Sequence, residues 1–135
     1  MDRYVDGPVA YLRDALNEPT ARAVVERLLN GAAELGTDPR NPPGCLLVQG
    51  ALACGEAAAP AREELVSRRA AGEAEIRRRL KRAKAEGDLP AAADPADLAR
   101  YVATIMQGLA VQAAGGASRA KLRRVVQTAL RAWPK

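Results

Sequence analysis

The sequence predicts an all-α protein, and three observations lead to that prediction. Alanine, leucine, arginine and glutamate are abundant, and these residues lose little conformational entropy when they enter a helix. No Asn-Gly or Asp-Gly pair joins two runs of alternating apolar and polar residues, so the hairpin signal is missing. Proline, glycine and capping residues instead divide the chain into stretches with apolar residues every three or four positions.

The length and composition indicate one globular domain that covers residues 1–135. A chain of 135 residues is long enough for one hydrophobic core and too short for two ordinary ones. Its 48% hydrophobic and 27% charged content is typical of a folded protein rather than a disordered one. Only 3% of the residues are aromatic and none is Phe, so we expect an aliphatic core.

The first expected helix covers Asp2–Asn17, and Gly7-Pro8 either kinks it or marks the start of the helix proper. Thr20 is the expected N-cap of a second helix that ends at Gly36. A proline-rich loop follows at 38–44.

Three further helices and one short one are expected after that loop. Cys45–Gly55 is apolar nearly all round, which predicts a short buried helix. Ala59–Glu86 reads as a long, heavily charged helix. Asp94–Ala114 begins with Asp at the N-cap and Pro at the first helical position, and Ser118 caps a last helix that runs to Trp133. The connection between these two helices is so short that they should be antiparallel neighbours.

The Asp94–Ala114 stretch carries more apolar surface than one helix face needs. On a helical wheel its apolar arc spans roughly 200°, whereas a surface helix needs little more than ~100°. One face consists of Leu98, Tyr101, Val102, Ile105 and Leu109, and beside it lie Met106, Ala99, Ala110 and Ala103. Two explanations stay open: a central buried helix, or a subunit interface built from this helix and the last one.

The residues needed for common catalytic and metal sites are missing. The chain has no histidine, and hence no imidazole base or ligand. Cys45 and Cys54 are nine positions apart, which places them on opposite faces of a continuous helix, so we expect unpaired structural cysteines. No glycine-rich phosphate loop is present. We therefore expect a protein that is not an enzyme, with no catalytic residue, no metal and no cofactor.

The net charge of +5 includes a basic run at Arg77–Lys84, which suggests a nucleic-acid contact. Acidic residues lie four positions before basic ones in the same helix, the order that favours ion pairs: Glu64–Arg68, Glu73–Arg77 and Glu75–Arg79. No aromatic residue is interleaved for base stacking. A solvated, helix-stabilising face is therefore favoured over a nucleic-acid surface.

The sequence contains no membrane span or secretion signal by the usual criteria. No apolar run approaches the ~20 residues that a transmembrane helix requires. The first residues, MDRYVD, are not a basic stretch followed by an apolar one. We expect a cytoplasmic protein without membrane contact.

Several short segments resemble, in order, the C-terminal domain of TetR/AcrR-family transcriptional regulators. Asn41–Leu52 reads NPPGCLLVQGAL, which is similar to a glycine-cysteine segment midway through that domain. The other matching segments are 2–5 (DRYV), 85–90 (AEGDLP), 94–99 (DPADLA), 106–112 (MQGLAVQ) and 116–118 (GAS). The resemblance covers essentially the whole chain and implies a helical bundle of about six helices, which dimerises by forming a four-helix bundle.

The resemblance also implies a function. Regulators of this family repress transcription until a small molecule binds in the C-terminal bundle. They begin with about fifty residues of helix-turn-helix, which nothing in this sequence matches. We therefore expect the sensing and dimerisation half of such a regulator, a homodimer that binds a small apolar effector and does not bind DNA specifically by itself.

The family's pattern supplies candidate residues for the pocket, and together with the apolar stripes of the last two helices it supplies candidates for the dimer interface. Residues expected to line the effector pocket are Tyr11, Leu12, Cys45, Val48, Gln49, Leu52, Arg69, Ile76, Tyr101, Ile105 and Met106. Residues expected at the dimer interface are Val102, Leu109, Ala110, Leu122, Val126, Leu130 and Trp133. For each aliphatic pocket candidate, ordinary core packing is the favoured role, whereas the polar Gln49 and Arg69 are the better pocket candidates if they point inward.

Two other functions remain open for the whole chain. One is a protein-interaction module that dimerises or docks a partner without a small-molecule ligand. The other is a small helical nucleic-acid-binding protein, which would show salt-dependent DNA binding.

Overall fold

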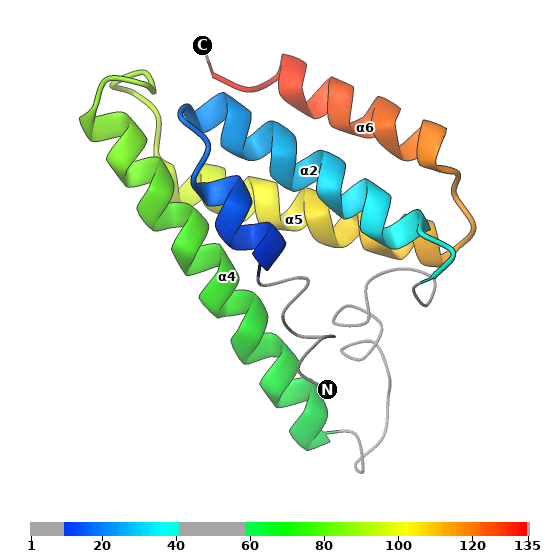
Figure 1. Cartoon of the computed structure of the whole chain (residues 1–135). Helices are drawn as coiled ribbons and strands as arrows, with labels where there is room; N and C mark the ends of the chain where they lie inside the picture. Colours follow the sequence, from blue (N-terminus) through cyan, green and yellow to red (C-terminus); the bar gives the residue numbers. More distant parts are fainter. Residues whose placement is uncertain (1–9, 41–58, 135) are drawn as a thin grey trace.

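A computed structural model describes residues 10–40 and 59–134 of the chain. Its helices are α2 (Ala21–Thr37), α4 (Ala59–Ala85), α5 (Pro95–Ala114) and α6 (Arg119–Arg131), and residues 10–16 form a further short helix (Figure 1). No strand occurs in these two ranges, so the predicted all-α class is confirmed. The predicted helix at Cys45–Gly55 and the first residues of Asp2–Asn17 lie outside the described residues.

Capping side chains set the starts of three helices where the sequence predicted them. The hydroxyl of Thr20 accepts a hydrogen bond from the backbone N–H of Ala23 at the start of α2. The carboxylate of Asp94 accepts the N–H of Ala96 before α5. The hydroxyl of Ser118 accepts the N–H of Lys121 at the start of α6. Each cap satisfies a backbone donor that has no partner within its own helix.

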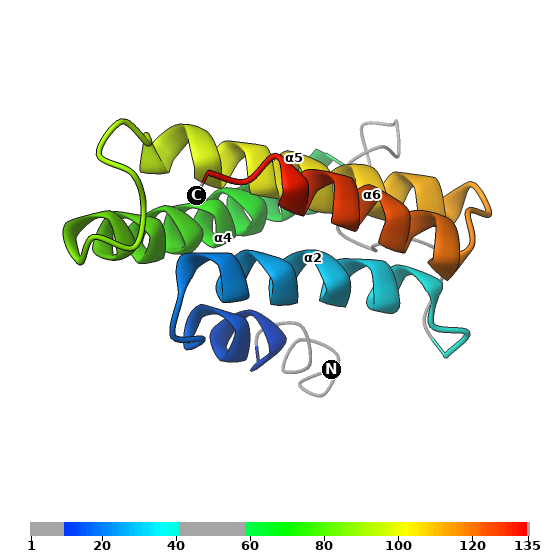
Figure 2. The ribbon, with the colours of Figure 1, turned by 90° about the horizontal axis from the view of Figure 1, so that it is seen from above.

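The helices form layers around α2. Figure 2 shows the short helix 10–16 on one side of α2, with α5 and α6 on the other. α2 packs most extensively on α5 and α6, and α4 packs mainly on α5. The first part of α4 extends beyond the other helices, as Figure 1 shows.

The core between these helices is aliphatic, as the composition predicted. Its largest fully buried side chains are Leu28, Leu29, Leu80, Leu109, Leu122, Val24, Val25, Val102 and Val126. Burying each such side chain stabilises the fold by about 1.5–3 kcal/mol. Trp133, after α6, also belongs to this core, with 3% of its surface exposed.

Two charged side chains of the α4 region hold the turn between the helix 10–16 and α2. From α4, Arg79 donates from Nε to the carbonyl of Leu16 (3.0 Å) and from Nη2 to that of Glu18 (2.9 Å). Asp88, just after α4, accepts the backbone N–H of Ala21 at 2.6 Å. Cations favour helix C-termini and anions favour helix N-termini, so both contacts follow the helix dipoles.

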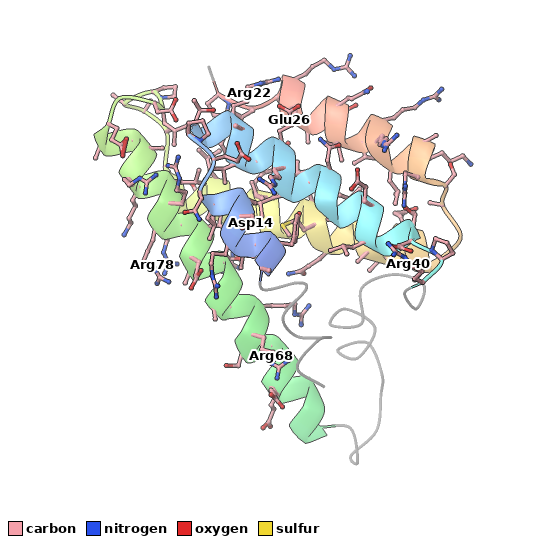
Figure 3. All side chains as sticks on the ribbon, in the orientation of Figure 1. Asp14, Arg22, Glu26, Arg40, Arg68 and Arg78 are labelled. Carbon is pink, nitrogen blue, oxygen red and sulfur yellow. The ribbon has the colours of Figure 1, made fainter. Side chains whose placement is uncertain are left out.

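The position of Arg79 corrects a sequence prediction. Arg79 is buried, with only 6% of its surface exposed, instead of lying on a solvated face paired with Glu75. Glu75 pairs with Arg78 at 3.5 Å, and Glu73 pairs with Arg100 of α5 at 3.3 Å instead of with Arg77. Only the predicted Glu64–Arg68 pair is found, at 2.7 Å. Figure 3 shows Arg68 and Arg78 pointing outward from α4.

Tyr11 attaches the other end of the short helix to α2. Its hydroxyl donates to the carbonyls of Arg27 and Leu28, and burial raises the pKa of that hydroxyl above its usual value. The ring occupies the space in which a Cβ at Gly31 would stand. Because Gly31 has no side chain, the Tyr11 ring can pack directly against α2.

Candidate dimer face and effector-facing residues

The seven side chains expected at a dimer interface are buried inside the single chain. Their exposed fractions are Val102 0%, Leu109 2%, Ala110 4%, Leu122 1%, Val126 1%, Leu130 8% and Trp133 3%. In the single chain these side chains already pack against the chain's own helices. The strongest apolar stripe of an amphipathic helix faces its own neighbours, which explains this burial, and the interface role of these seven residues stays a prediction.

The same two helices present a second, weaker apolar stripe to the outside. Tyr101 (39% exposed) and Val111 (44%) lie on α5, and Val125 (46%) lies on α6. Around them are the exposed residues Thr104, Gly108, Gly115, Lys121, Thr128 and Ala132. Along α5 these residues recur at 101, 104, 108, 111 and 115, a spacing of three and four that keeps them on one face. We name this set the outer face.

A hollow of about 410 Å³ lies on the outer face where α5 turns into α6. It is lined by Val111, Gln112, Gly115, Gly116, Ala117 and Lys121. Val111 of the α5 stripe and Lys121 of the α6 stripe both border it, so the two stripes meet at this end of the helices. A Cβ added at Gly108, one turn before the hollow, would meet nothing within 4 Å.

The residues expected in an effector pocket do not gather around one cavity within the described ranges. Ile76 is buried (3% exposed), and Tyr11, Leu12, Ile105 and Met106 are half-buried against the core. Arg69 is half-buried, and Tyr101 lies on the outer face. Cys45, Val48, Gln49 and Leu52 lie outside the described residues. The pocket therefore stays a prediction, and Ile76 has the burial of a core residue.

A second hollow, of about 310 Å³, was not predicted from the sequence. It lies between the short helix, the end of α2 and the start of α6, and its lining is Tyr11, Gly31, Glu34, Leu35, Asp38, Arg40 and Arg119. Gly31, a glycine inside an otherwise regular helical stretch, is the one sequence signal of a close approach there. Of the predicted pocket residues, only Tyr11 borders it.

The rim of this second hollow is charged. Arg40 donates from Nε and Nη2 to Asp38 at 3.1 and 2.9 Å, and its backbone N–H donates to the same carboxylate. These hydrogen bonds lower the pKa of Asp38 to about 2. Figure 3 shows Arg40 at the end of α2. The charge makes this hollow a poor match for the apolar effector that the sequence suggested.

The described ranges also contain no group of His, Cys, Asp and Glu residues arranged to hold a metal ion. Among the helices at 10–40 and 59–134, none combines the length and apolarity needed to cross a membrane.

Residues 19–133 match the family described as the tetracyclin repressor-like C-terminal domain. The chain is 28% identical over 137 aligned positions to the HTH-type transcriptional repressor ComR of Escherichia coli (strain K12). That alignment includes the whole chain and 65% of ComR, so the chain spans about two thirds of that repressor's length.

Two solved structures are closer in sequence. Both are cysteine variants of the TetR-family transcriptional regulator CifR, complexed with 26-base-pair double-stranded operator DNA. One is 38% identical with a TM-score of 0.89 over 97% of this chain, and the other is 37% identical with a TM-score of 0.90 over 98%. In both, the matched part is 69% of the CifR chain. The family match covers most of the chain, so the chain belongs to the TetR family of transcriptional regulators and contains its C-terminal domain.

Proposed function

We propose that this chain is the effector-sensing and dimerisation domain of a transcriptional repressor, which releases operator DNA when a small molecule binds. The family membership supports the regulatory role, and the CifR structures contain operator DNA. DNA is bound in this proposal by a helix-turn-helix domain of the whole regulator and not by the helices described here.

The outer face is the observation that carries the dimerisation half of the proposal. Three large apolar side chains, Tyr101, Val111 and Val125, are between 39% and 46% exposed on one side of α5 and α6. A two-fold dimer needs one self-complementary patch, and two adjacent antiparallel helices provide it. We therefore propose a homodimer in which α5 and α6 of each copy form a four-helix bundle.

The sensing half rests on half-buried apolar residues of the short helix and of α5. Leu12, Ile105 and Met106 pack at the margin of the core without being fully enclosed. Apolar, partly enclosed positions of this kind are typical of small-molecule sites. We propose an apolar effector there, and Arg69 of α4 is the candidate for its polar contact.

Three further parts of the account follow from this role. The whole chain acts as one domain, and it is not an enzyme, because the relatives are regulators and no catalytic group is required for sensing. We also propose a cytoplasmic location, because a regulator of transcription works where the DNA is, and in a bacterium the DNA lies in the cytoplasm.

A thermal-shift screen tests the sensing role. A ligand that binds only the folded state stabilises it by RT ln(1 + [L]/Kd), about 2.7 kcal/mol at a hundred times Kd. We expect small apolar molecules to raise the melting temperature of the chain, and Met106→Ala to reduce that shift, whereas Arg131→Ala on the exposed side of α6 should leave it unchanged. If no apolar compound shifts the transition while the chain is dimeric, the chain is a dimerisation module without a ligand.

A further inference from the structure

We propose that Tyr101 of one copy inserts into the hollow at the α5–α6 turn of a second copy, in an antiparallel contact between the two α5 helices centred on Gly108. The inference rests on the dimer proposed above and gives it a register. In this register the phenol ring of Tyr101 from the second copy occupies the hollow.

The first argument is the distribution of large and small residues along α5. In a two-fold contact, whatever residue i meets on the partner also meets residue i on the first copy. If Gly108 lies on the axis, positions equally far before and after it face each other. Tyr101 then faces Gly115, seven residues to either side, and Thr104 faces Gln112. Tyr101, the largest exposed side chain of the stripe, therefore faces Gly115, which has no side chain.

The second argument is the space available at each of these positions. A Cβ at Gly108 would meet nothing within 4 Å, so the two helix axes can approach closely there. Gly115 borders the hollow of about 410 Å³, which is a space able to hold an aromatic ring. Tyr101 is 39% exposed in the single chain and gains burial on entering that hollow.

The third argument is distance. Seven residues of helix span ~10 Å, so Tyr101 and Gly115 each lie that far from the axis. At the crossing angle of ~20° that is usual in four-helix bundles, two facing positions this far out are displaced sideways by about 4 Å. A tyrosine side chain spans that displacement. A glycine at the crossing point and long side chains away from it are therefore the combination that this register needs.

The chemistry of the hollow also suits a phenol. Lys121 of α6 borders it, and its ammonium can donate a hydrogen bond to the hydroxyl oxygen of Tyr101. The same cation is favourable close to an aromatic face. Val111 supplies an apolar wall for the ring.

Cysteine cross-linking tests the register. The background is the full 135-residue chain with Cys45→Ser and Cys54→Ser, so that only introduced thiols react. Gly108→Cys, with open space around its Cβ, should form a disulfide-linked dimer under mild oxidation. Gly115→Cys is also tolerated sterically, because its added Cβ meets only the carbonyls of Gln112 and Val111 at ordinary contact distances of 3.5 and 3.7 Å. In the proposed register it faces position 101 and should not form a disulfide with its own copy.

The second arm mixes two single variants of different length, a tagged Tyr101→Cys chain and an untagged Gly115→Cys chain. With a short bismaleimide, we expect the mixed product in clear excess over both same-variant products. Arg78→Cys on the exposed side of α4 is the matched control and should give none. Circular dichroism and sedimentation of each variant before cross-linking show whether it is folded and dimeric.

The outcomes separate the register from the dimer itself. A folded, dimeric background in which Gly108→Cys does not cross-link overturns the register and leaves the proposed dimer standing. Preferential cross-linking of Tyr101→Cys with Gly108→Cys also overturns it, because the axis then lies between residues 104 and 105. A background that sediments as a monomer overturns the dimer, and the register with it.

Discussion

Arg22 and Arg119 each bind the C-terminal carbonyl groups of the helix to which they do not belong, at opposite ends of the antiparallel pair α2 and α6. Nη1 of Arg22 donates to the carbonyl of Leu130 in the last turn of α6, at 3.0 Å. Nη2 of Arg119 donates to the carbonyl of Glu34 in the last turn of α2, at 3.3 Å, and its Nε donates to the hydroxyl of Thr37 at 2.9 Å. The last carbonyls of a helix lack partners within it and carry partial negative charge, so a guanidinium is a favourable cap at both ends.

Removing either arginine should weaken the packing of α6 against α2 without separating the two helices. We expect Arg22→Ala and Arg119→Ala each to lower the free energy of unfolding by about 1 kcal/mol, the usual contribution of a partly exposed hydrogen bond to a carbonyl. The two residues lie at opposite ends of the pair, so their effects should add in the double variant. Urea unfolding of the four proteins measures this, and strong non-additivity would show that the two caps are not independent.

Arg79 should matter far more than the arginine beside it. Arg79→Ala removes two hydrogen bonds from a buried cation to the carbonyls of Leu16 and Glu18, and we expect a loss of about 2–5 kcal/mol. Arg78→Ala is the matched control, because its side chain is 66% exposed and forms only a surface pair with Glu75. That control should lose no more than about 0.5 kcal/mol. Equal losses in the two variants would contradict the buried role of Arg79.

Gly31 and Tyr11 should be energetically coupled. In the native chain Gly31→Ala should be destabilising, because the added methyl group overlaps the Tyr11 ring. With Tyr11→Ala, the same change should become stabilising by up to about 1 kcal/mol, since alanine is the better helix former. A double-mutant cycle measured by chemical unfolding gives the coupling, and a change of sign is the expected signature. A Gly31→Ala effect that is the same in both backgrounds would mean that the ring does not occupy this space.

The carboxylate of Asp38 should titrate far below its usual range. Hydrogen bonds from Arg40 hold its pKa at about 2, below the ordinary value of 3.8. A pKa that is lower in the folded state means that the Asp38–Arg40 interaction stabilises the fold. This stabilisation is fully present above about pH 4 and is lost as the pH falls through 2. NMR titration of the Asp38 side chain checks the value, and Arg40→Ala should move the midpoint upward. A midpoint that the substitution leaves unchanged would exclude Arg40 as the cause.

The helix boundaries were predictable because local chemistry decides them. Thr20, Asp94 and Ser118 cap helices in the structure as they were expected to from the sequence. Pro95 and Gly87 stand where a helix starts and where one has ended, for reasons contained within a few residues.

The roles of individual side chains were less predictable, because they depend on which helix lies opposite. The wheel of α5 showed an apolar arc wide enough for two neighbours but did not tell the core side from the outer side, so Val102 and Leu109 were assigned to an interface and lie in the core. Arg79 shares its sequence pattern with exposed neighbours. Its burial follows from the end of the helix 10–16 lying against α4, a long-range contact that no local pattern contains.

The outer face also changes which substitution tests the dimer. Val126 is one of the residues expected at the interface, but Val126→Glu would place a charge in the core of the single chain, where the residue is 1% exposed, and would unfold it. Val125, its neighbour on α6, is 46% exposed on the outer face. Val66 of α4 is a matched control, a valine of similar exposure (50%) on a different helix.

Sedimentation analysis of the unmodified chain, Val125→Glu and Val66→Glu at ~10 μM tests the central claim, since a standard-size interface of ~1,600 Å² should persist at micromolar concentration. We predict that the unmodified chain and Val66→Glu sediment at twice the 14.3 kDa mass of one chain. Val125→Glu should sediment as a folded monomer, because the two-fold axis brings two unpaired carboxylates into one apolar contact. A monomeric unmodified chain, or a Val125→Glu dimer as stable as that of Val66→Glu, would contradict the dimerisation face assigned to α5 and α6.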